Sequence, residues 1–203
     1  MNHTESQRII TRIGKYYFQL QGRYFMHLKF SLAIPLTFLT TVAHYSPVMS
    51  AEAEKIETFR SLNVEAASKA AWEALRACRK QGYSVAVAVV DRGGNVQALL
   101  RDRYAGPHTP ETATRKAWTA NSFRQPTATL AELLQQGKIP NQVQHNPGAL
   151  LVGGGLLIES AGQIIGGIGV SGAPPGKSEK DSIDGACAQS GLDAIQELLE
   201  MGD

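Results

Sequence analysis

The chain has 203 residues, with 20 Lys and Arg against 18 Asp and Glu, and its formal net charge is +2. Five of the cations but only Glu5 among the acids lie in residues 1–51, so the rest of the chain has a net charge of −2. A single domain of about 150 residues with this charge lacks the basic patch that nucleic-acid backbones require, and we expect no nucleic-acid partner.

The N-terminal residues predict export. Lys29 precedes a short apolar run, and small residues follow up to Ala53, an order typical of a secretory signal peptide. The run is shorter than the roughly 20 apolar residues that span a bilayer; a buried core helix is the alternative. We predict an N-terminal extension and signal peptide over residues 1–51, a short linker over 52–61 and one domain over 62–203. The mature chain would be periplasmic or secreted, with no membrane span.

The predicted domain alternates between helical and strand patterns. Apolar residues recur at three- and four-residue steps after Asn63, which is placed to cap a helix. Residues 85–90 are all apolar and predict a strand covered on both faces. Thr127, after Pro126, is placed to cap a later helix. In chain order we predict a helix from Val64 to Gly82, strands at 84–90 and 96–101, helices at 111–123 and 127–136, strands at 149–152, 156–158 and 163–170, and a helix at about 182–201.

Tight turns join most of these strands. Asp91-Arg92-Gly93-Gly94-Asn95 connects the first two, and Ser160-Ala161-Gly162 connects the last two. Because hairpins outnumber crossovers, we predict an α+β fold, with about five antiparallel strands packed with helices and with the N- and C-terminal helices flanking the sheet.

Two nucleotide-binding signatures overlap near the last strand. Residues 167–172 match G-x-G-x-x-G, and residues 176–178 end like a phosphate-binding loop. The first signature requires a parallel strand after the next helix, and Pro174 and Pro175 offer no N–H to a phosphate. The strand glycines instead favour a close approach by another backbone or a ligand, so we expect no nucleotide binding.

The chain has two cysteines, Cys78 and Cys187. Both lie on apolar faces of helical patterns. An exported protein allows them to form a disulfide if their Cα atoms lie within about 7 Å. Packed free thiols are the alternative.

Several motifs occur in a fixed order along the domain. They are V-A-V-V-D-R-G-G-N at 87–95, A-G-P-H-T-P-E-T-A at 105–113, R-K-A-W-T-A at 115–120, G-G-G at 153–155, G-I-G-V-S-G at 167–172 and D-G-A-C-A-Q-S-G at 184–191. Over nearly all of residues 62–199 this order resembles the haem-binding family of GlcG, HbpS and the PduO C-terminal domain, and it is most similar to the secreted members. The resemblance implies a five-stranded antiparallel sheet, homo-oligomers and, in some members, bound haem or a related tetrapyrrole.

The side chains suggest where a haem would bind. The candidate axial ligands beyond residue 51 are His108, His145, Tyr83, Tyr104 and a cysteine thiolate. We favour His108, because it precedes a helix N-terminus that would attract a haem propionate; a surface or capping role is the alternative. Aromatic residues are few, so a haem would lie in a shallow groove or between subunits. The predicted site consists of His108 as metal ligand, with Glu111, Arg103, Lys116 and Gly172.

These features predict an exported haem-binding or haem-sensing protein, oligomeric and not itself an enzyme. Its ligand would be haem or another small anion, and a membrane sensor is a candidate partner. The alternative is an accessory or catalytic protein of small hydroxy-carboxylate metabolism, because the family it resembles includes a member from a glycolate operon. His108 and Glu111, three residues apart, would then form an acid–base pair.

Overall fold

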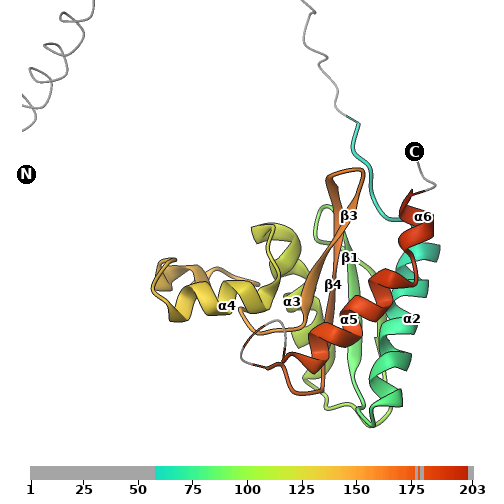
Figure 1. Cartoon of the computed structure of the whole chain (residues 1–203), viewed down its shortest axis with the longest axis horizontal. Helices are drawn as coiled ribbons and strands as arrows, with labels where there is room; N and C mark the ends of the chain where they lie inside the picture. The colour runs from blue at the N-terminus through green and yellow to red at the C-terminus, as the bar shows by residue number, and fades with distance from the viewer. Residues whose placement is uncertain (1–57, 177, 179–180, 201–203) are drawn as a thin grey trace, which may run out of the picture. The chain divides into compact units, whose positions relative to one another are not determined.

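The computed structural model describes residues 58–176, 178 and 181–200 (Figure 1). The predicted signal peptide and most of the predicted linker therefore lie outside the described residues. The elements are α2 (Val64–Lys80), β1 (Ala86–Asp91), β2 (Val96–Arg101), α3 (Thr109–Phe123), α4 (Thr127–Gln135), the 3-10 helix η1 (Asn141–His145), β3 (Gly155–Ser160), β4 (Gln163–Ser171), α5 (Ile183–Asp193) and α6 (Gln196–Glu200). None of the helices in these ranges is long and apolar enough to cross a membrane.

The four strands form one antiparallel sheet in the order β2-β1-β4-β3. β1 is central and nearly all of its residues are buried, as its unbroken apolar run predicted. The β3–β4 hairpin turns through Ala161 and Gly162, whose φ angles of 49° and 73° suit a two-residue hairpin turn. The α+β class and the antiparallel sheet are therefore confirmed.

The prediction of a fifth strand at residues 149–152 is wrong, because side chains of α3 bind the backbone there. Arg115 Nη2 donates to the carbonyl of Ala149 at 2.7 Å, and Thr119 Oγ1 accepts the N–H of Leu150 at 2.8 Å. A strand would need these backbone groups for ladder bonds. The segment instead runs as a loop along α3.

The two faces of the sheet carry side chains of different size. Val85, Val87 and Val89 point into a core shared with α2 and α5, whereas Ala86 and Ala88 cluster with Ala113 of α3. Figure 1 shows α2 and α5 together on one side of the sheet and α3 on the other. We predicted that the N- and C-terminal helices flank the sheet. In the structure these helices, α2 and α5, lie on the same face of it.

Glycines of β4 let α3 pack directly on the strand. A Cβ added at Gly167 would lie 2.6 Å from the carbonyl oxygen of Ala117, and one at Gly169 would collide with the carbonyl oxygen of Ala113. The G-x-G pattern therefore serves the close approach of another backbone, one of the two alternatives from the sequence. β4 pairs antiparallel with both neighbours, so the pattern does not belong to a dinucleotide-binding unit.

Replacing Gly169 with alanine should lower the free energy of unfolding by about 2–3 kcal/mol, because α3 must move away from β4. Urea unfolding followed by circular dichroism would measure this loss. Gly93→Ala is the control, since its Cβ would meet only the ends of two side chains, at 3.0 and 3.2 Å. Equal stability of the two variants would contradict this account of the glycine.

The predictions of the helix ends are confirmed at some positions and wrong at others. Asn63 caps α2 as predicted, with its Oδ1 accepting the N–H of Ala66 at 2.9 Å. The prediction that Thr127 caps α4 is wrong, because this residue lies inside the helix and its hydroxyl accepts the N–H of Gly155 at 2.8 Å. The predicted final helix is divided into α5 and α6, with buried Ile195 at the break.

Cys78 and Cys187 form a disulfide, with their Cα atoms 5.5 Å apart. The bond joins the last turn of α2 to α5, and both residues are fully buried. Of the two alternatives from the sequence, the bridge is the one present.

Candidate functional site

The loop between β2 and α3, residues 102–108, lies at one end of the sheet. Hydrogen bonds of its first residue, Asp102, fix it to the rest of the domain. This buried residue donates its N–H to the carbonyl of Val85 at 2.9 Å. Its carboxylate accepts a hydrogen bond from Arg79 Nε at 2.6 Å. The Arg79 guanidinium holds the pKa of Asp102 below its usual value, so the carboxylate stays ionised at neutral pH. The loop is therefore fixed although most of its residues are exposed.

His108 is exposed at the N-cap position of α3, and its side chain makes no capping hydrogen bond. Its ring lies over Gly106, where an added Cβ would be 2.7 Å from Cε1 and 2.9 Å from Nδ1. Gly106 also binds the start of α3, because its carbonyl accepts from the Thr109 hydroxyl at 2.8 Å. The structure thus presents this imidazole to solvent on a fixed turn.

Two other predicted site residues are exposed beside His108 in the sequence. Arg103 lies over the ring of Tyr104, 4.8 Å from guanidinium carbon to ring centroid. Tyr104 is 76% exposed, which is unusual for a large aromatic side chain. Glu111 is exposed in the first turn of α3. The end of the sheet therefore carries an imidazole, a guanidinium, an aromatic ring and a carboxylate within ten residues.

Gly172 lies at the same end of the sheet, since Ser171 pairs with Ala86, and Ala86 with Arg101. It is exposed and has a φ of 135°, a value that side chains disfavour. A Cβ there would lie 2.6 Å from the carbonyl oxygen of Ser84. Topology thus brings Gly172 to the end where the 102–108 loop begins.

Lys116 lies beneath this surface and is not open to solvent. Its side chain is 2% exposed, and Nζ donates to Asp184 Oδ2 at 2.8 Å and to the carbonyl of Val170 at 2.9 Å. The N–H groups of Gly172 and Ala173 donate to the same carboxylate. Lys116 therefore joins α3, β4 and α5, and our proposal for ligand binding does not rely on it.

Burial shifts both members of this ion pair toward their neutral forms. It lowers the pKa of Lys116, against the attraction of Asp184, and it raises the pKa of Asp184, against the attraction of Lys116. Each charge therefore depends on the other to remain ionised inside the protein.

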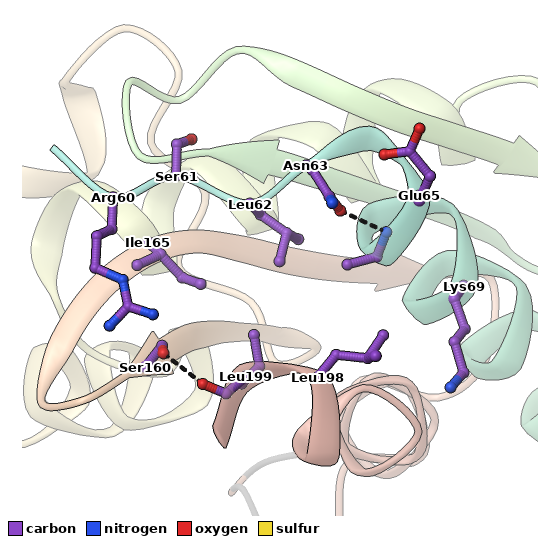
Figure 2. Close-up of a pocket in the computed structure, with 11 residues that line it drawn as sticks. Arg60, Ser61, Leu62, Asn63, Glu65, Lys69, Ser160, Ile165, Leu198 and Leu199 are labelled. Atoms are coloured by element: carbon purple, nitrogen blue, oxygen red, sulfur yellow. Dashed lines mark hydrogen bonds between the residues drawn. The ribbon is translucent and has the colours of Figure 1, made fainter. Parts of the chain in front are cut away.

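Three pockets of the described residues lie away from this end of the sheet. The one in Figure 2, of about 560 Å³, lies between the segment before α2, the β3–β4 hairpin and α6. There the Ser160 hydroxyl donates to the carbonyl of Leu199 at 2.7 Å. None of the three is lined by His108, Glu111, Arg103, Lys116 or Gly172. The predicted site is thus an exposed rim on a single chain.

The side chains of this rim fit a haem in donor chemistry. Among the described residues, no group of three or more His, Cys, Asp or Glu is placed to hold a bare metal ion. A single exposed imidazole suits an iron whose other donors come from a porphyrin, and a guanidinium and a helix N-terminus suit its propionates. The exposed ring of Tyr104 offers an apolar surface for a flat molecule.

The fold and the rim define a small α+β protein with exposed polar side chains at one end of an antiparallel sheet. The chain belongs to the family described as haem degrading protein HbpS-like, which residues 62–193 match.

Individual relatives agree with this assignment. A Citrobacter freundii protein, described as an uncharacterized 15.0 kDa protein in the dhaT-dhaS intergenic region, is 30% identical over 71% of this chain and 99% of its own length. A crystal structure of HbpS is 39% identical, covers 72% of this chain and 98% of that chain, and has a TM-score of 0.63. The crystal structure of a PduOC:heme complex is 27% identical, covers 66% and 95%, and has a TM-score of 0.59.

Proposed function

We propose that this chain binds haem at the rim formed by residues 102–108, the first turn of α3 and Gly172. The observation that carries the proposal is His108, an exposed imidazole on a fixed turn in a chain whose relative PduOC was crystallised with heme. The proposed role is binding or sensing rather than catalysis.

Each rim residue has a proposed part in binding. His108 would supply a nitrogen ligand to the iron, and Arg103 would pair with a propionate. Glu111, three residues after His108, is spaced to accept a hydrogen bond from the second imidazole nitrogen and so orient the ring. Gly172 would border the ligand with its backbone, which Asp184 and the packing against Ser84 hold in place. Haem supplies the redox-active iron, and these residues bind and orient it.

Replacing His108 with alanine should weaken haem binding at least tenfold and remove the shift in the Soret band that hemin shows with the wild-type chain. The reason is the loss of the proposed iron ligand, whereas the propionate contacts would remain. Absorption titrations of the full chain with hemin would measure both effects. His145→Ala is the matched control, because His145 is also exposed but lies on η1. Unchanged spectra and affinity in His108→Ala would contradict the proposal.

We further propose that the mature chain is exported and assembles into oligomers. Export is supported by the signal-peptide pattern before residue 52 and by the disulfide, since such bonds persist in oxidising compartments. Oligomer formation is supported by β2, an edge strand on which Val96 and Leu99 are 46% and 45% exposed. Exposed apolar residues on an edge strand are typical of a surface that pairs with another chain.

A further inference from the structure

A pocket of about 490 Å³ lies at the other end of α3 from His108. We call it the arginine pocket; its lining includes Phe59, Arg92, Asn121, Arg124, Gln163 and Ile164. His108 precedes the first residue of α3 and Arg124 follows the last, so the length of the helix, about 22 Å, separates them. The pocket is therefore distinct from the proposed haem site.

The arginine pocket is positively charged. Among the described residues, two guanidinium groups line it, those of Arg92 and Arg124, and no carboxylate does. Arg92 is held in place, because its Nη1 donates to the carbonyl of Ile164 at 3.1 Å and its guanidinium lies 4.8 Å from the ring centroid of Phe59. Asn121 Nδ2 donates to the backbone carbonyl of Arg92 at 3.0 Å. This arrangement favours an anion.

Arg124 occupies a backbone position that other residues fill at lower cost. It is the C-cap of α3 with φ 55° and ψ 38°, the left-handed conformation, and its N–H donates to the carbonyl of Ala120. Glycine or asparagine usually occupies this position, because a larger side chain is strained there. An arginine kept at a strained position that faces a cationic pocket indicates a role for its side chain.

The side chains of the arginine pocket do not suit a haem iron. The residues that the structure describes around it include no His, Cys, Met or Tyr, so they offer no usual axial ligand to a haem iron. The pocket does contain Phe59, which is 60% exposed and whose ring lies against the guanidinium of Arg92. We propose that the arginine pocket binds a small aromatic carboxylate, with the carboxylate at Arg124 and Arg92 and the ring against Phe59.

Part of the pocket wall lies outside the residues that match the family model. Phe59 precedes residues 62–193, so the aromatic wall comes from the segment before that match. The inference therefore rests on this chain's own side chains and is independent of the proposed haem site.

The test is calorimetric titration of the full chain with benzoate, with acetate and benzyl alcohol as analogues that lack the ring or the charge. We expect benzoate to bind with a dissociation constant of about 1 mM or lower, and each analogue to bind at least tenfold more weakly. Arg124→Gly should weaken benzoate binding at least tenfold while its melting temperature stays equal or rises, because glycine relieves the strained backbone. Lost binding in a variant of equal or greater stability cannot come from misfolding.

Two control variants separate this site from general charge and from haem. Arg76→Gln removes an exposed arginine of α2 that pairs with Glu73 and should leave benzoate binding unchanged. His108→Ala should also keep benzoate affinity while it loses haem. The proposal is overturned if the wild-type chain does not bind benzoate, or if Arg124→Gly binds it as tightly as the wild type.

Discussion

Replacing both Cys78 and Cys187 with alanine is expected to lower the free energy of unfolding by about 4 kcal/mol. The bridge closes a loop between residues 109 apart in the sequence, which strongly restricts the unfolded chain. It also joins α2 to α5 on the face of the sheet where the larger core lies. Urea unfolding of wild-type and double-alanine chains under oxidising conditions would measure the difference.

A reductant separates the effect of the bond from that of the smaller side chains. Adding a phosphine reductant during unfolding should lower the stability of the wild type by most of the 4 kcal/mol and leave the double-alanine chain unchanged. If the reductant destabilises neither protein, the bridge does not contribute to folding.

The elements that sequence alone predicted are those whose local pattern and tertiary role agree. β1 is apolar from Ala86 to Val90, where helices cover both of its faces, and β4 has glycine at Gly167 and Gly169, where α3 packs on the strand. Residues 149–152 have a strand pattern, yet Arg115 and Thr119 bind the backbone of Ala149 and Leu150. Those partners are more than 30 residues distant in the sequence, and no local pattern reveals the contact.

In the candidate site, too, local patterns predicted some features, whereas contacts between distant residues determine others. The position of His108 before a helix followed from the helical pattern that begins at Glu111, and the structure presents it to solvent. Lys116 is a predicted site residue because a cation there could pair with a propionate, yet its side chain is buried. Its spacing of three residues from Ala113, on a helix face of small residues, was the signal for burial, and Asp184 in the last shared motif was the signal for its partner. The strained backbone of Arg124 had no sequence signal.

The buried ion pair shows how the ligand rim depends on the interior. Asp184 accepts the N–H groups of Gly172 and Ala173 on one side and the ammonium group of Lys116 on the other. The conformation of the exposed Gly172 is thus linked to a charge that Lys116 balances. We therefore expect a substitution of Lys116 to lower the stability of the fold and, as a consequence, to disturb Gly172 at the rim.

Replacing Lys116 with methionine is therefore expected to lower the free energy of unfolding by about 3–5 kcal/mol at pH 7.5, because the carboxylate of Asp184 stays buried without its counter-charge. Lys116→Met/Asp184→Asn is the matched control. It removes both charges at similar volume and should recover a large part of the loss. Chemical unfolding of the three proteins would measure these differences.

The pH dependence tests whether the unbalanced charge is the cause. Burial already raises the pKa of Asp184 in the wild type, against the attraction of Lys116, and loss of the lysine should raise it further. Over the range between the unfolded pKa of about 4 and the raised folded pKa, the folded variant holds a proton that the unfolded chain has released. Its stability therefore falls as pH rises through that range, and the loss caused by Lys116→Met should be smaller at pH 5 than at pH 7.5. An equal loss at both pH values would mean that methionine disturbs the packing of α3 rather than leaving a charge unpaired.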